Sequence, residues 1–151
     1  MDINRFGQRM IALLPRILRG FTRRESNYLS RGRITIPQLG VLEQLSRQKE
    51  VPMNELARGM GVTRPAATGL VDRLLSQDLV SRRGDPADRR VIRVSLTAKG
   101  RRVLNGIWSQ KRRMIQEVFG RLPAGDRAQY LATLEKVVEI LSEEPGGSRS
   151  S

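Results

Sequence analysis

Two short amphipathic segments joined at Gly61 run directly into an alternating apolar stretch, and this order constrains the fold more than any other feature. Ala57 is small where two helices must cross closely, and Gly61 follows four residues later, where a turn tolerates a positive φ. This spacing predicts a helix-turn-helix. We expect a short helix over residues 53–60 and a second helix over residues 64–77 that Thr63 caps.

A charged turn then separates two short segments of strand character, residues 79–83 and 91–96. In the second segment Ile92, Val94 and Leu96 alternate toward one face, which indicates a β-hairpin. A helical unit followed at once by a two-stranded element is the order of a winged helix. The sequence therefore predicts a mainly α fold with a small β-hairpin (α+β).

Further helices are expected on both sides of this unit. Apolar spacing predicts a long helix over residues 3–29, bent rather than terminated at Pro15, and another over residues 37–47. Thr97 caps a helix that runs to residue 119, and a last helix covers residues 127–142.

The charge of the chain points to an anionic partner. Lys and Arg total 28 against 15 acids, a formal net charge of +13, and most of the bases are arginines, whose planar fork matches phosphates and base edges. The chain has no Cys and no His, which removes thiolate chemistry, the usual metal ligands and the commonest general base. We expect no catalytic residue, metal or cofactor.

No apolar run is long enough to span a membrane, and the N-terminus lacks the layout of a signal peptide. We therefore expect a cytoplasmic protein without a membrane partner.

The predicted helix over residues 64–77 presents a small-faced surface. Pro65, Gly69 and Arg73 point away from its apolar side, with Ala66 and Thr68 on the flanks. Short side chains with a few donors suit a helix that presses into the major groove, where Thr68 can meet a thymine methyl or a base edge. Arg64 and Arg73 can reach guanine or flanking phosphates. The alternative is that Thr63, Arg64 and Pro65 only start a helix well.

The turn of the hairpin carries the second candidate contact. Asp85 and Pro86 set the turn, and Arg89 and Arg90 emerge where a guanidinium can enter the minor groove or grip its phosphates. Asp88 is expected to hold the guanidinium of Arg90 in a forked ion pair before DNA arrives. The alternative is a solvated charged turn.

The stretch from ITIPQLGVLEQL through ELARGMGVTRPAATGLVDRL to DRRVIRVSLTAKG, residues 34–100, resembles the MarR family of bacterial winged-helix regulators. The resemblance implies that Arg90 is the minor-groove arginine with Asp88 as its partner. It also gives a DNA-facing role to six residues: Thr63, Arg64, Pro65, Ala66, Thr68 and Arg73. Members that sense peroxide or zinc use cysteine or histidine, which this chain lacks.

The resemblance further implies a homodimer, and the terminal helices carry more apolar surface than one small winged domain can cover. The alternative is that these helices pack only on their own domain. The expected organisation is an N-terminal dimerisation helix (1–33), the winged helix-turn-helix domain (34–97), C-terminal dimerisation helices (98–143) and a flexible tail (144–151).

The function expected from these features is sequence-specific regulation of transcription. A two-fold dimer requires a palindromic operator in double-stranded DNA, and repression with release by a small aromatic or anionic effector is the expected mode. Candidate effector contacts are Met10, Arg16, Phe21, Tyr28 and Trp108, all of which can equally be ordinary helix packing. The alternative function is an architectural or low-specificity nucleic-acid-binding protein, which the positive charge would also support.

Overall fold

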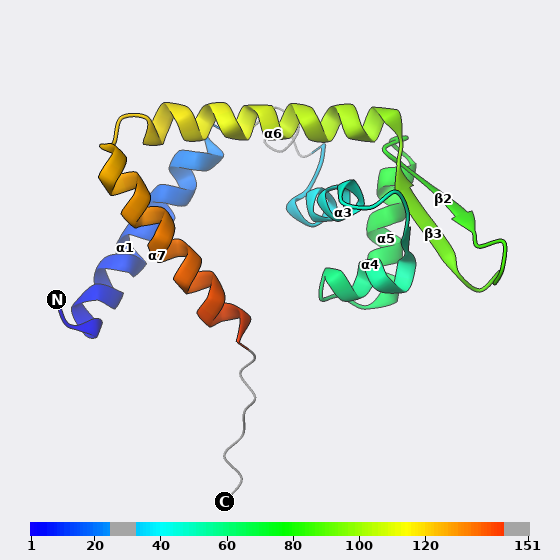
Figure 1. Ribbon diagram of the computed structural model, residues 1–151, viewed down its shortest axis with the longest axis horizontal. Coiled ribbons are helices and arrows are strands. Elements are labelled where there is room, and N and C mark those ends of the chain that lie inside the picture. The colour runs from blue at the N-terminus through cyan, green and yellow to red at the C-terminus, as the bar shows by residue number, and fades with distance from the viewer. Residues whose placement is uncertain (25–32, 144–151) are drawn as a thin grey trace, which may run out of the picture. The chain divides into compact units, whose positions relative to one another are not determined.

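The computed structural model describes residues 1–24 and 33–143. Along the chain it contains α1 (Ile3–Thr22), α3 (Ile36–Ser46), β1 (Val51–Pro52), α4 (Met53–Gly59), α5 (Arg64–Leu75), β2 (Val80–Gly84), β3 (Ile92–Leu96), α6 (Ala98–Phe119) and α7 (Ala124–Ser142) (Figure 1). The predicted class, mainly α with a small β element, is confirmed. Packing divides the chain into two compact units, Met1–Arg112 and Arg113–Ser151, and the boundary falls inside α6.

The winged region is built around α3, and a reciprocal capping box between Thr35 and Gln38 closes the first turn of this helix. The Thr35 hydroxyl accepts the N–H of Gln38 at 3.3 Å, and the Gln38 amide oxygen accepts the N–H of Thr35 at 2.9 Å. One core then joins α3, α4, α5, the strands and the first half of α6. Its largest fully buried side chains are Ile34, Leu42, Leu45, Leu56, Leu74, Leu104 and Ile107, with Val41, Val51, Val71 and Val94.

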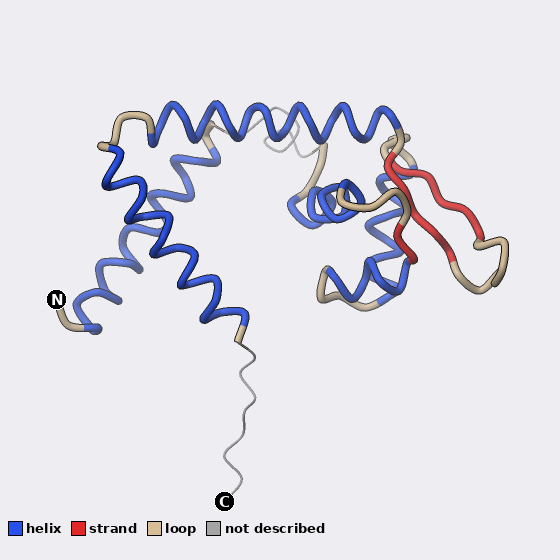
Figure 2. The backbone as a smooth tube through the Cα atoms, in the orientation of Figure 1, coloured by secondary structure: helices blue, strands red, loops and turns tan. Residues whose placement is uncertain are grey.

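The strands form an antiparallel sheet in the order β1-β3-β2 (Figure 2). Val94 in the central strand pairs with Val51 on one side and Arg82 on the other, and it is fully buried. The two predicted strands are confirmed to within one residue at each end. Strand β1 was not predicted, because two residues are too few to show an alternating pattern.

The base of the hairpin joins the end of α5 to the start of α6 through several hydrogen bonds. Asp78 ends the turn after α5 at φ 57°, a left-handed conformation that aspartate tolerates better than most residues. Its carbonyl accepts the Thr97 hydroxyl at 2.6 Å, and that hydroxyl accepts the N–H of Gly100 at 2.9 Å. Lys99 Nζ donates to the Gln77 carbonyl at 2.8 Å. The first turn of α6 is therefore fastened to the C-terminal end of α5.

The N-terminal helix differs from its predicted length. Pro15 lies inside α1, which continues across it as predicted, but α1 ends at Thr22 rather than at residue 29. Residues 25–32 and the predicted tail lie outside the described residues.

In the second unit, α7 begins at Ala124, three residues earlier than predicted, and the rings of Phe119 and Tyr130 lie 5.5 Å apart. No helix in the described ranges has both the length and the apolar character needed to cross a bilayer.

Gly100 allows α6 to approach the hairpin base closely, which gives a first prediction. An added Cβ at Gly100 would overlap the Leu79 carbonyl oxygen, whereas one at Gly106 in the same helix would meet no atom within 4 Å. Gly100→Ala is expected to lower the free energy of unfolding by about 1–3 kcal/mol. Gly106→Ala is expected to raise it by up to about 1 kcal/mol, as alanine does in helix interiors. Urea denaturation measures the free energy of unfolding of both variants. Equal changes in the two variants would contradict the close approach of Gly100 to the Leu79 carbonyl.

Candidate nucleic-acid interface

The helix pair α4 and α5 has the local geometry that the sequence predicts. Gly61 adopts φ 64° just after α4, and the Val62 N–H donates to the Ala57 carbonyl at 3.0 Å, which closes the helix. Thr63 is the N-cap of α5, and its hydroxyl accepts the N–H of Ala66 at 3.3 Å. Helix α5 therefore starts at Arg64, at the exposed end. Pro65 has no N–H and the Thr63 carbonyl also accepts the N–H of Ala67, so Arg64 carries the one N–H of the first turn that has no partner among the described residues.

The outward face of α5 is small and exposed. Arg64, Pro65, Ala66, Gly69 and Arg73 are exposed, whereas the residues on the opposite side lie in the core. An added Cβ at Gly69 would meet nothing within 4 Å, so no part of the described chain covers this face. The face is shaped for close approach by another surface.

Thr68 lies at the edge of this face and is half-buried. Its hydroxyl donates to the Arg64 carbonyl one turn earlier, at 2.9 Å. The hydroxyl proton is therefore used within the helix, which leaves the methyl group and the oxygen lone pairs for an outside partner.

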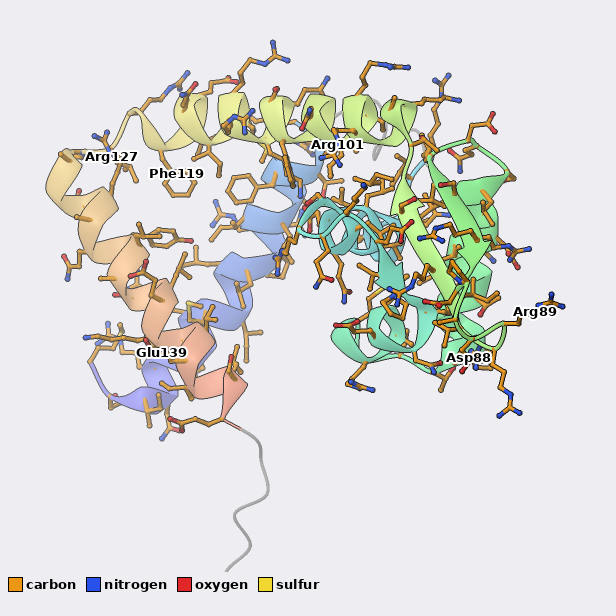
Figure 3. The ribbon with its side chains drawn as sticks, turned by 45° about the vertical axis from the view of Figure 1, so that its right-hand side comes forward. Asp88, Arg89, Arg101, Phe119, Arg127 and Glu139 are labelled. Carbon is orange, nitrogen blue, oxygen red and sulfur yellow. The ribbon has the colours of Figure 1, made fainter. Side chains whose placement is uncertain are left out.

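The turn between β2 and β3 is closed by its own backbone and by Asp85. The Asp85 N–H donates to the Val91 carbonyl at 2.8 Å, and one Asp85 carboxylate oxygen accepts the N–H of Ala87 at 2.8 Å. This is the turn-setting role predicted for Asp85. Arg89 extends away from the tip of the hairpin (Figure 3).

Asp88 differs from its predicted role. Its carboxylate accepts the backbone N–H of Arg90 at 3.0 Å, and no ion pair with the Arg90 guanidinium is present among the described residues. The short side chain reaches the amide two residues ahead more readily than a long guanidinium can fold back to it. Asp88 fixes the backbone from which the Arg90 side chain leaves, and no described acid pairs with the guanidinium.

Two arginines face one another across the hairpin, a feature that the sequence reading missed. Arg83 and Arg93 are register partners in β2 and β3, and opposed like charges destabilise a sheet. Each is paired with an acid. Arg83 binds Glu50 through two bonds of 2.6 and 2.7 Å, and Arg93 Nε binds an oxygen of Asp85 at 2.5 Å. We call these four residues the wing network.

The wing network sets the acidity of its carboxyl groups. The hydrogen bond from Arg83 holds the pKa of Glu50 below its ordinary value. The hydrogen bond from Arg93, followed by the N–H of Ala87, lowers the pKa of Asp85. Both carboxylates are therefore ionised and engaged at neutral pH, and neither is free to repel a phosphate.

A further ion pair joins the wing to α5. Alternation along β2 directs Arg82 to the face opposite Arg83, and Arg82 Nη1 lies 2.8 Å from an oxygen of Asp72 on α5. Both side chains are about half exposed, so the pair contributes little to stability. Its effect is positional, because it ties the hairpin to the helix beside it.

The predicted DNA-contacting cations differ from these paired arginines. Within the described residues, no acidic side chain pairs with Arg64, Arg73, Arg89 or Arg90. Arg64 and Arg73 lie on α5, and Arg89 and Arg90 lie at the hairpin tip. Cations without an internal partner remain available to an external anion.

No interaction among the described residues brings the predicted effector contacts together. Trp108 belongs to the winged region, where its indole N–H donates to Glu43 on α3 at 3.2 Å. Met10 and Phe21 are half-buried on one side of α1, whereas Arg16 is exposed and lies about 120° around the helix from Met10. Tyr28 lies outside the described residues. A cavity of about 290 Å³ is lined by other residues: Arg33, Ile34, Gln77, Leu79, Lys99 and Val103.

Comparison with known proteins identifies similar chains. The model of the MarR family matches residues 34–92. YsmB, an uncharacterized HTH-type transcriptional regulator of Bacillus subtilis, is 32% identical over 104 residues, which cover 69% of this chain and 71% of YsmB. NicR, an HTH-type transcriptional repressor of Pseudomonas putida, is 33% identical over 93 residues, which cover 62% of this chain and 58% of NicR.

Among solved structures, a cysteine-to-serine mutant of MarR from E. coli matches with a TM-score of 0.67 and 27% identity. The match covers 91% of this chain and 97% of that chain.

The lowered pKa values give a prediction about pH. A carboxyl group with a lower pKa in the folded state stabilises that state above its ordinary pKa, and this contribution is lost as the pH falls through the lowered value. In Arg93→Gln, the pKa of Asp85 is expected to rise toward its ordinary value, while that of Glu50 changes less. Carboxyl NMR titration of both proteins measures the shift. An unchanged Asp85 titration in Arg93→Gln would contradict the pairing.

Proposed function

Because the chain belongs to the MarR family of DNA-binding transcriptional regulators, we propose that it is a repressor that binds a palindromic operator as a homodimer. Its relatives and its fold are those of transcriptional regulators and not of enzymes.

In the proposed complex, α5 enters the major groove with its small face toward the bases. The observation that carries this proposal is that the exposed face around Ala66 and Gly69, which no described residue covers, lies beside cations that have no acidic partner in the described chain. Small side chains let the helix backbone come close to base edges. Arg64 sits at the N-terminus of α5, where its own backbone N–H and the positive end of the helix dipole also favour a phosphate. Arg73 is placed to reach a phosphate or guanine from the same face.

The hairpin supplies the second contact of the proposed complex. The wing network neutralises Arg83 and Arg93, so Arg89 and Arg90 are the cations at the tip that remain for DNA. An arginine inserted into the narrow minor groove meets its enhanced negative potential. The bond from Asp88 to the Arg90 backbone orders the chain at that point before binding, which reduces the entropy lost on association.

Exposed apolar faces on the terminal helices support the proposed homodimer. In α1, Phe6, Leu13 and Ile17 are 45%, 40% and 44% exposed, and in α7 Leu134 and Leu141 are 42% and 77% exposed. Apolar surface of this extent on helices marks an interaction surface. A two-fold dimer would present its α5 helices about one turn of DNA apart, about 34–36 Å, and so require a palindrome.

Release by a small aromatic or anionic effector is the regulatory part of the proposal. Met10, Arg16 and Phe21 on α1 remain candidate contacts, and Tyr28 and Trp108 complete the set. An effector acts only through a difference in its affinity for the DNA-bound and the free arrangements of the dimer.

A low-specificity coat protein is the alternative function, and selection of bound sites from a random DNA pool separates the two. A repressor of the proposed kind yields one consensus with two-fold symmetry. Recovery of unrelated sequences with equal affinity would favour the alternative.

The wing contact gives a prediction on the selected operator. Arg90→Ala is expected to weaken binding by about 1–3 kcal/mol, because a minor-groove cation is lost. Asp88→Ala is expected to cause part of that loss without unfolding the protein, because it removes only the bond to the Arg90 backbone. A mobility-shift assay measures both, with Arg121→Ala as the control for an exposed arginine outside the two DNA-reading elements. Unchanged affinity in Arg90→Ala would remove the wing from the mechanism.

The homodimer gives a separate prediction. Leu134→Glu places a charge on the apolar face of α7 and is expected to weaken dimerisation by at least tenfold, because burial of an unpaired charge is costly. Gln129→Glu adds the same charge on the polar side of α7 and is expected to have little effect. Sedimentation equilibrium measures both. A dimer unaffected by Leu134→Glu would exclude this face of α7 from the interface.

A further inference from the structure

Five arginines form a single stripe along α1. They are Arg5, Arg9, Arg16, Arg19 and the C-cap residue Arg23. At about 100° per residue, the last four lie about +40°, +20°, −40° and 0° around the helix from the first. The stripe therefore occupies a sector about 80° wide, and its 18-residue span makes it about 27 Å long. We call it the arginine stripe.

Apolar residues fill the opposite side of α1. Ile3, Met10, Leu14 and Phe21 lie about 140–180° around the helix from Arg5. The helix thus has one apolar face and one cationic face. Phe6, Leu13 and Ile17, the exposed residues that support the homodimer, lie about 80–120° from Arg5, so a second copy packed on them would lie beside the arginine stripe rather than over it.

No acid neutralises the arginine stripe within the described chain. The one acidic residue among residues 1–24 is Asp2, which caps the helix by accepting the backbone N–H of Arg5 at 3.0 Å. No described ion pair involves any of the five guanidinium groups. Arg24, which is not in the stripe, donates instead to the Gly20 carbonyl at 3.1 Å.

Solubility alone does not account for this arrangement. Arg5 with Arg9, and Arg19 with Arg23, are like charges one turn apart, which destabilise a helix. Alternating acids and bases on the same face would keep the helix soluble and stabilise it as well. A row of one sign becomes favourable when a polyanion lies against it.

We propose that the arginine stripe binds the phosphate backbone of duplex DNA outside the sequence that α5 reads. The guanidinium fork matches phosphate geometry, and every base in the stripe is an arginine rather than a lysine. A stripe of about 27 Å can follow about eight base pairs at 3.4 Å each. This inference rests on the proposed function in that its partner is DNA, but it needs neither a palindrome nor a repressor.

The stripe adds affinity and not sequence preference, because phosphates are the same in every sequence. A membrane surface with anionic lipid is the competing partner for a cationic amphipathic helix. It would require the apolar face of α1 to enter the lipid. In the proposed homodimer the second copy packs on apolar residues of α1 and competes with lipid for them, and we therefore favour DNA.

The test compares two pairs of substitutions in the full chain. Arg9→Gln with Arg16→Gln removes two charges from the arginine stripe, and Arg121→Gln with Lys136→Gln removes two charges elsewhere. Binding is measured against salt concentration on the selected operator with long flanks and on a random-sequence duplex of the same length. At about 0.9 per phosphate contact, the stripe pair is expected to flatten the slope of log K against log salt by about 1.8 for each protomer, or about 3.6 for the homodimer, on both duplexes. The control pair is expected to leave the slope nearly unchanged.

A charge-conserving pair separates electrostatics from damage to the helix. Arg9→Lys with Arg16→Lys keeps both charges and is expected to restore the slope, while circular dichroism and sedimentation compare helix content and dimerisation. Equal slopes for the stripe pair and the control pair would overturn the proposal. Loss of binding to phosphatidylserine vesicles with unchanged DNA slopes would assign the stripe to lipid instead.

The same binding measurements distinguish a failure of the proposed function from a failure of the proposal for the arginine stripe. A wild-type protein that binds both duplexes equally contradicts the sequence-specific function, yet the stripe pair still tests the stripe through its slope.

Discussion

The wing of this protein depends on neutralising two arginines that its own strand register brings face to face. Arg83 and Arg93 are partners across β2 and β3; Glu50, just before β1, pairs with Arg83, and Asp85, just after β2, pairs with Arg93. The same carboxylate of Asp85 also closes the turn. Asp85 therefore balances the charge of Arg93 and also sets the geometry of the turn. Its result is a hairpin whose body is internally paired and whose tip carries unpaired cations.

This arrangement explains why the sequence predicted some features and not others. Local signals were sufficient for the Thr63 cap, for the left-handed Gly61 and for both hairpin strands, because each depends on neighbours a few residues away. The pairing of Glu50 with Arg83 joins residues 33 apart. This pairing can be predicted only when the register of β2 against β3 is known, and the sequence alone did not assign that register. Once β2 and β3 are aligned, two opposed arginines signal that acids are needed nearby.

The two incorrect expectations have local causes. Asp88 was expected to bind a guanidinium, but an aspartate two residues before an amide closes on the backbone instead. Helix α1 was expected to reach residue 29, but its apolar residues at helical spacing stop at Phe21, and the structure ends the helix at Thr22. The last residue of a helix is the least certain part of such an expectation. The DNA-contacting residues and the effector contacts remain predictions.

The junction between α5 and α6 has a mechanical consequence. Thr97, Lys99 and Gly100 fasten the first turn of α6 to the residues that end α5, and an alanine methyl at position 100 would not fit between them. If the first turn of α6 rotated by itself, it would break these three hydrogen bonds or press position 100 against the Leu79 carbonyl. Any reorientation of α6 is therefore coupled to the end of α5, and the exposed face of α5 would turn with it.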